Sequence, residues 1–296
     1  NVFFQDEDGG VTLMKTIPSN YVAYFNHSGE EHPDYPFIAG LFDTMTGGQE
    51  SDLRNDYSAY IAIAAEHGGA ARVELCQNLF EGGTTPSIGA VYQTLERVGI
   101  KVNVIIRPRG GDFLYSNDEF EAMKHDIVTL KAAGINGVVI GMLNTDGSID
   151  TERTRQLIEI SRPLEVTFHR AFDVSADPFR SLDDLISIGA DRLLTSGQEP
   201  SVLEGVDLIA ELVRRAGDDI IIMPGAGITA KNLTRIIRET GAQEYHVTGS
   251  SPMTSKMEFR NERCFMGKAL YPPEFSIKVT DSEKIRHYVN LLNKLP

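Results

Sequence analysis

Side chains that can do chemistry follow several short apolar runs, at the point where each run stops. Two of them, Glu74 and Cys76, are two residues apart and so share one face of a strand. A carboxylic acid and an imidazole can act as general acid and general base, and an arginine can bind a carboxylate or phosphate through two parallel hydrogen bonds. The side chains at these positions are Glu74, Cys76, Arg107, Arg109, His169 and His246.

Glycine-rich turns after the last two runs predict a place for an anion. In α/β barrels, phosphate is often held by the loops after strands seven and eight, where backbone N–H groups point outward. With two arginines added, the predicted anion-binding set is Arg107, Arg109, Gly225, Gly227, Gly249 and Ser250. The candidate catalytic residues are Glu74, His169 and Arg107.

Each of these residues also has an ordinary structural interpretation. A single arginine or glutamate near a strand end is often half of an ion pair, and a lone cysteine often fills space as a small apolar side chain. A glycine-rich turn often serves only to reverse the chain. The convergence of all of them at one end of a sheet favours a binding site.

The elements that must position these residues repeat along the chain. An amphipathic helix, a glycine or a proline, and a β-branched run recur about every 25 to 35 residues. This alternation is typical of parallel strands joined by helices, and an eighth unit would close a (β/α)8 TIM-type barrel, irregular at its first strand. An open doubly wound sheet is disfavoured, because no Gly-x-Gly-x-x-Gly follows the first run. The runs are 72–76, 102–107, 137–141, 164–169, 191–195, 219–223 and 244–248.

Composition excludes several functional classes. The 296 residues carry 28 Lys and Arg against 42 Asp and Glu, a formal charge of −14, which argues against nucleic-acid and anionic-membrane partners. No apolar window is long enough to span a bilayer, and no basic and apolar leader opens the chain. Two cysteines, Cys76 and Cys264, do not make a disulfide framework and suit a reducing cytoplasm.

The charge divides the chain into two parts. Residues 1–56 hold two basic and ten acidic side chains and show no sustained period, so we expect an irregular acidic arm. Its apolar segment 37–42 is a candidate for the first strand of the barrel. Residues 57–296 are expected to form the barrel, with a C-terminal extension from about 252.

Six motifs, taken in order, resemble the CutC copper-homeostasis family. The likeness covers the chain from about residue 57 to its end, and the segments 257–260 and 275–281 are similar to the eukaryotic branch. The motifs are VELC at 73–76, EGGTTPS at 81–87, IRPRGGDF at 106–113, TFHRAFD at 167–173, LTSG at 194–197 and MPGAG at 223–227.

This resemblance implies a TIM-type barrel, homo-oligomers, a cytoplasmic and also nuclear location, and a role in copper handling. It further implies Cu(I) binding by cysteine thiolate, a soft donor that suits this ion, with Cys76 at the matching position. The family's partner cysteine stands on the first strand, and by residue count Asn55 occupies that place here. Cys264 lies in the C-terminal extension and is not assumed to replace the partner cysteine, so the second ligand is open between a methionine, the histidine of a neighbour and a symmetry-related Cys76.

Three functions fit these observations. The first is a copper-homeostasis protein that binds Cu(I). The second is a barrel enzyme that acts on a small phosphorylated or carboxylated metabolite at the mouth of the barrel. The third is a non-catalytic scaffold that acts through oligomerisation.

Overall fold

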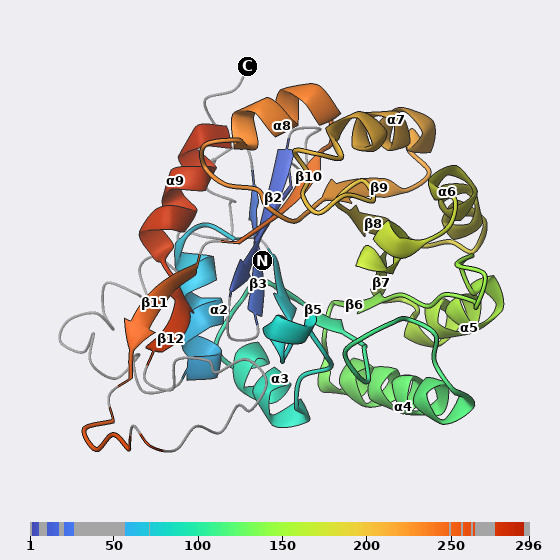
Figure 1. Ribbon diagram of the computed structural model, residues 1–296. Coiled ribbons are helices and arrows are strands. Elements are labelled where there is room, and N and C mark those ends of the chain that lie inside the picture. Colours follow the sequence, from blue (N-terminus) through green and yellow to red (C-terminus); the bar gives the residue numbers. More distant parts are fainter. Residues whose placement is uncertain are drawn as a thin grey trace.

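The computed structural model describes residues 2–5, 11–17, 21–26, 57–70, 72–248, 250–255, 257–261, 263 and 276–292. Parallel strands form a barrel, and helices surround it (Figure 1). The predicted TIM-type fold is confirmed, and each of the seven predicted runs overlaps a strand. They are β4 Arg72–Leu75, β5 Lys101–Ile105, β6 Gly137–Ile140, β7 Glu165–Phe168, β8 Arg192–Thr195, β9 Ile221–Pro224 and β10 Glu244–Thr248.

Helices follow or precede these strands in the expected alternation. Helix α4 shows why the sequence folds this way: Ser116 and Glu119 form a reciprocal capping box at its start, and Gly134, with φ 94°, ends it. The helices are α2 Tyr57–His67, α3 Ile88–Leu95, α4 Asn117–Ala133, α5 Thr151–Ser161, α6 Pro178–Ser187, α7 Val206–Ala216, α8 Leu233–Thr240 and α9 Ser282–Leu292, with 3-10 turns η1 Leu79–Glu81 and η2 Arg170–Val174.

The first-strand position of the barrel holds an antiparallel hairpin instead of one parallel strand. Strand β2 Val11–Ile17 pairs in parallel with β10 and antiparallel with β3 Tyr21–Asn26, whose Tyr21 pairs with Leu75 of β4. Strand β1 Val2–Gln5 pairs antiparallel with β2 and β10. The ring closes at the other side of β10 through a bridge between His246 and Gly225.

Within the part of the chain expected to be an irregular arm, three segments form β1, β2 and β3. They are rich in Val, Thr, Phe and Tyr, which favour strands, and residues 18–20 between β2 and β3 are Pro, Ser and Asn, types frequent in turns. The candidate strand 37–42 and Asn55 lie outside the described residues.

The two faces of the barrel strands differ in chemistry. Side chains that point outward, such as Val73, Leu75 and Val104, pack with the helices in one hydrophobic core. Alternate positions on the same strands, such as Arg72 and Glu74, are buried but polar, because they point into the barrel. The interior is thus lined with groups that need partners.

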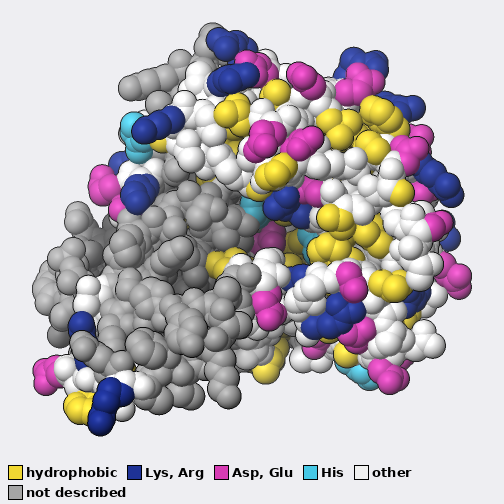
Figure 2. Space-filling model, in the orientation of Figure 1, with side chains coloured by type: hydrophobic (Ala, Val, Ile, Leu, Met, Phe, Trp, Pro, Cys, Tyr) yellow, Lys and Arg dark blue, Asp and Glu magenta, His cyan; other side chains and the backbone are white. Residues whose placement is uncertain are grey.

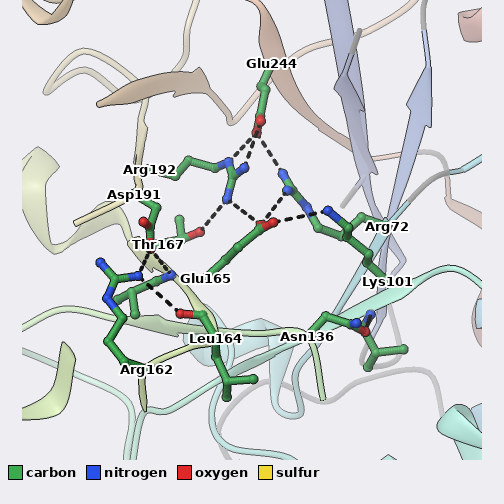
Figure 3. Close-up of polar contacts among 12 residues, drawn as sticks. Arg72, Lys101, Asn136, Arg162, Leu164, Glu165, Thr167, Asp191, Arg192 and Glu244 are labelled. Carbon is green, nitrogen blue, oxygen red and sulfur yellow. Dashed lines mark hydrogen bonds and ion pairs between the residues drawn. The ribbon is translucent and has the colours of Figure 1, made fainter. Parts of the chain in front are cut away.

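A cluster of ion pairs lies at the start of the strands, on the side of the barrel opposite to their carboxyl ends (Figure 3). Arg192 binds both carboxylate oxygens of Glu244, and Arg72 reaches the same carboxylate at 2.7 Å. Glu165 contacts both arginines and also Lys101, whose Nζ lies 3.2 Å from its Oε1. This end of a barrel usually serves stability, and these pairs fill it.

The C-terminal region adds a small sheet and a helix. Strand β11 Ser250–Thr254 pairs antiparallel with β12 Ser276–Thr280. Helix α9 follows and lies next to α2 (Figure 1). Among the helices of the described residues, none is both long and apolar enough to cross a membrane.

Candidate functional site

A cavity of about 300 Å³ lies at the carboxyl ends of the strands. Figure 2 shows a hollow near the middle of one face, where histidine, acidic and basic side chains lie together. Its polar lining combines acids, histidines, arginines and a thiol, and apolar side chains line the larger part of the cavity. The lining residues are Glu74, Cys76, Leu79, Glu81, Gly82, Ile105, Arg107, Phe113, His169, Arg170, Asp173, Val174, Leu194 and His246.

Arg107 is buried and held by the backbone of two loops. Its Nη1 donates to the carbonyl oxygens of Glu81 and Gly83, each at 2.7 Å, and its Nη2 donates to the carbonyl oxygen of Gly111 at 2.9 Å. Its Nε–H has no partner among the described residues. The arginine therefore organises the mouth and still has hydrogen-bond donors to offer a ligand.

His169 is fixed in one tautomer by its own backbone. Its Nδ1 accepts a hydrogen bond from the N–H of Ala171 at 3.1 Å, so the proton of the neutral ring is on Nε2. That Nε2 has no partner among the described residues. Burial, and then the charge of Arg107, lowers the pKa of His169 to about 3. The ring acts as a neutral hydrogen-bond donor, and the predicted role of general base does not fit this tautomer.

An aromatic ring brings Arg107 and His169 into one arrangement. The guanidinium carbon of Arg107 lies 5.1 Å from the centre of the Phe113 ring, and the ring of His169 lies 5.0 Å from it. Gly141 makes room on the other side, because a Cβ there would lie 2.3 Å from Cε1 of His169. Two of the predicted site residues are therefore brought together by two residues to which the sequence had assigned no role.

Glu74 lines the same cavity from strand β4. Burial raises the pKa of its carboxyl to about 7, against the opposing effect of Arg72 and Arg192 below it. A carboxyl with this pKa can hold or release a proton near neutral pH. The predicted acid–base role of Glu74 is compatible with its position.

Cys76 faces the cavity from an apolar surrounding. It packs with Ile105, Val139 and Leu79, and Gly83 leaves the room that its side chain needs. Burial raises the pKa of the thiol to about 12, so the sulfur is protonated when nothing is bound. The described part of the chain contains no cluster of three His, Cys, Asp or Glu residues arranged for a metal ion. Cys264 and Asn55 lie outside it.

Arg109 does not belong to the cavity. Its Nε donates to Glu119 at 2.6 Å, and its two Nη atoms donate to the backbone of Gly110, Asp112 and Leu114 and to the Asp112 carboxylate. These contacts join the loop after β5 to the start of α4. The prediction of an anion contact at Arg109 does not agree with this placement, because its donors are already used within the protein.

The predicted phosphate cradle is not formed by the described residues. The N–H of Gly225 donates to the carbonyl oxygen of Thr195 at 2.8 Å and is not free for an anion. Gly225 and Gly227 instead permit close packing, since a Cβ would lie 2.6 Å from Cβ of His246 and 2.8 Å from Cβ of Ser201, respectively. Gly249 is outside the described residues, and Ser250 begins β11 rather than a helix.

Asp173 is a cavity residue to which the sequence analysis gave no role. Its carboxylate accepts hydrogen bonds from the hydroxyl of Thr195 and from the N–H and hydroxyl of Ser196, and it pairs with Arg170 at 2.6 Å. Arg170 also donates to the Ser196 hydroxyl. The signal was present in the motif 167–173, where an acid follows a histidine and an arginine by one turn. This network joins the ends of β7 and β8.

Comparison with known proteins gives consistent matches. The model of the CutC family matches residues 56–251. The copper homeostasis protein cutC homologs of Mus musculus and Homo sapiens are each 51% identical over 225 residues, which is 76% of this chain and 83% and 82% of those proteins. A family protein CutC of Parabacteroides distasonis is 50% identical over 233 residues, 78% of this chain and 96% of that protein.

A solved structure shows the same fold. The crystal structure of the CutC protein from Streptococcus agalactiae is 40% identical and superposes with a TM-score of 0.58. The superposition covers 61% of this chain and 89% of that one. The family match begins at residue 56, so the hairpin of β2 and β3 precedes the matched region.

Proposed function

The chain belongs to the CutC family, and we propose on this premise that the protein acts in copper homeostasis by binding Cu(I) as cargo at the mouth of the barrel. The names of its relatives support the copper relation. The observation that carries the proposal for this chain is the Cys76 sulfur in the cavity lining, because a soft sulfur donor suits Cu(I).

The surroundings of Cys76 determine how Cu(I) binding depends on pH and which side chain can be the second ligand. A thiol with a raised pKa must lose its proton when it binds a metal, so the affinity for Cu(I) should increase with pH. His169 is not prepared as a second ligand, because its Nε2 carries the proton. His246 lines the same cavity, and burial lowers the pKa of its ring, which favours the neutral form that metals bind. We therefore propose His246 as the second ligand.

An anaerobic competition titration against a coloured Cu(I) chelator tests this function. We expect one equivalent of Cu(I) to be withdrawn from the chelator by the wild type, more tightly at pH 8 than at pH 6.5. Cys76→Ser should abolish this binding, whereas Cys264→Ser, the matched control, should retain it. Retained binding in Cys76→Ser, or none in the wild type, would contradict the proposal.

The resemblance to this family also implies an assembly and a location. We propose a homo-oligomer that works in the cytoplasm and also in the nucleus. Light scattering of the purified chain and fractionation of cells that produce it would test both statements. A monomer at micromolar concentration would contradict the first, and its confinement to another compartment would contradict the second.

A second candidate function is a barrel enzyme that acts on a small anionic metabolite. Two buried donors of cavity residues, the Nε–H of Arg107 and the Nε2–H of His169, lack partners among the described residues. An unpaired buried donor costs about 1–3 kcal/mol, and a Cu(I) ion cannot accept a hydrogen bond to relieve it. A ligand with anionic oxygens can. A carboxylate fits better than a phosphate, because the described residues form no glycine cradle.

Calorimetry separates this candidate from the first. A small carboxylate should bind the wild type without copper, and Arg107→Ala should weaken it by about 1.5–3 kcal/mol, the range for hydrogen bonds to charged groups. Unchanged affinity would remove Arg107 from the site. A thermal melt of Arg107→Ala must accompany the titration, because this arginine also holds the loops around Glu81 and Gly111.

A further inference from the structure

The Nε–H of Arg107 and the Nε2–H of His169, which have no partners among the described residues, differ in chemistry. This difference limits the class of ligand that can bind both. Arg107 offers a permanent positive charge, and three of its five N–H groups are already used by backbone carbonyls. His169 offers a single uncharged N–H, fixed by the hydrogen bond to Ala171. One donor thus suits a charged oxygen, and the other suits a neutral carbonyl oxygen.

The walls around these donors add a constraint on shape. Phe113 lies about equally far from the Arg107 guanidinium and from the His169 ring, at 5.1 and 5.0 Å. The Arg107 guanidinium lies over this ring, so Phe113 is a flat wall beside both donors. The remaining apolar lining, Ile105 and Leu194 among it, can take a short alkyl chain but offers no further charge. The cavity of about 300 Å³ has room for a molecule of a few heavy atoms.

We propose that the mouth of the barrel binds a short-chain 2-oxo acid, with the carboxylate on Arg107 and the keto oxygen on the Nε2–H of His169. In such a molecule the carboxylate and the carbonyl are adjacent and can lie in one plane, so that both donors are satisfied at once. The imidazole polarises the carbonyl while it stays neutral, as burial requires. This inference rests on the second candidate function, that of a small anionic metabolite, and names its ligand class.

Isothermal titration with four probes tests it. Pyruvate has both oxygens, lactate replaces the carbonyl by a hydroxyl, acetate lacks the second oxygen, and inorganic phosphate is tetrahedral. We expect pyruvate to bind at least about tenfold more tightly than lactate or acetate. His169→Phe, which keeps a ring of similar size, should remove the preference for pyruvate over lactate. Gly89→Ala, an exposed change on α3 with nothing within 4 Å of its new Cβ, should leave all affinities unchanged.

The outcomes distinguish this inference from the functions on which it depends. If phosphate binds and pyruvate does not, the 2-oxo acid is wrong while a small anionic ligand stands. If no probe binds, the 2-oxo acid and the wider proposal of a small anionic ligand are both wrong. If His169→Phe melts as the wild type does and keeps the preference for pyruvate, the keto oxygen does not contact His169. A Cu(I) titration of the same samples reports on the copper function separately.

Discussion

The Nδ1 atom of His169 accepts a hydrogen bond from the backbone N–H of Ala171, two residues farther along the chain, at 3.1 Å. This bond belongs to the start of the 3-10 turn η2, where His169 is the capping residue. The turn therefore sets the chemistry of the ring as well as its position. A buried imidazole whose Nδ1 is occupied in this way can only donate from Nε2.

The first prediction concerns the protonation state of this ring. In ¹⁵N spectra of histidine-labelled protein, His169 should stay in the neutral Nε2–H form from pH 8 down to about pH 4, because burial and Arg107 lower its pKa to about 3. The signal is assigned by its loss in His169→Phe. A ring that titrates near pH 6.5, or one with its proton on Nδ1, would contradict the proposed donor role.

The second prediction follows from the same pKa through the stability of the fold. The unfolded chain takes up a proton at His169 below about pH 6.5, whereas the folded protein resists it down to about pH 3. The stability that depends on the neutral ring is thus complete above pH 6.5 and is lost as the pH falls. Between these two pH values the free energy of unfolding falls by about 1.4 kcal/mol for each pH unit.

Urea unfolding of the wild type and of His169→Phe at pH 7 and pH 5 measures this effect. The wild type should lose roughly 2 kcal/mol more than the variant between the two pH values. Equal losses in the two proteins would show that His169 does not couple to folding in this way. Subtracting the loss of His169→Phe from the loss of the wild type cancels the contributions of the other titrating groups.

The third prediction concerns the space that Gly141 leaves for His169. Gly141→Ala places a Cβ 2.3 Å from Cε1 of the ring, and the contact is with a packed side chain, so the ring must move. We expect a destabilisation of about 1–3 kcal/mol, as for other overpacked sites. His169→Ala removes the ring that the new Cβ would meet. The double variant should therefore lose less unfolding free energy than the sum of the losses of the two single variants.

Gly89→Ala is the control for Gly141→Ala. Its new Cβ meets nothing within 4 Å, and alanine is the better helix former, so stability should stay equal or rise by up to about 1 kcal/mol. Thermal or urea unfolding of the wild type and of the four variants gives all these values. Additive effects of Gly141→Ala and His169→Ala would show that the two residues do not share the space.

Much of the fold could be predicted because local signals agree with the tertiary structure. Apolar runs predict the seven strands from β4 to β10. Ser116 and Glu119 at the start of α4 and Gly134 after it mark the two ends of that helix. The antiparallel hairpin could not be predicted in the same way. Its strands are recognisable by composition, but their place beside β10 and β4 depends on contacts far along the chain.

The site was predicted less well, for a reason that lies in the strands themselves. Arg72, Glu74 and Cys76 alternate with Val73 and Leu75 along the chain and point into the barrel, so the strand is polar on one face and apolar on the other. This period of two was readable in the sequence. Hydrogen-bond partners could not be read from the sequence. Arg109 and Arg107 stand in one motif, yet Arg109 uses its donors within the protein, whereas the Nε–H of Arg107 has no partner among the described residues.

The fourth prediction concerns the ion pairs at the start of the barrel strands, at the end opposite to the cavity. Glu244 is bound by Arg192 through both oxygens and by Arg72 at 2.7 Å, and all three side chains are buried. Glu244→Gln removes the buried carboxylate that both arginines share and leaves Glu165, which is partly exposed, as their remaining negative partner. Breaking a buried pair from one side typically costs about 3–5 kcal/mol, so we expect a loss in this range.

Glu239→Gln on α8 is the matched control for Glu244→Gln. It breaks a pair with Arg235 of the same chemistry, with Nε 2.9 Å from Oε1, but on the surface of a helix, where such pairs contribute about 0.3–0.5 kcal/mol. Urea unfolding at pH 7 and low salt compares the two variants. If both lose the same small amount, water reaches the cluster and screens its charges. If only Glu244→Gln is strongly destabilised, the ion pairs at this end hold the strands on which the mouth of the barrel is built.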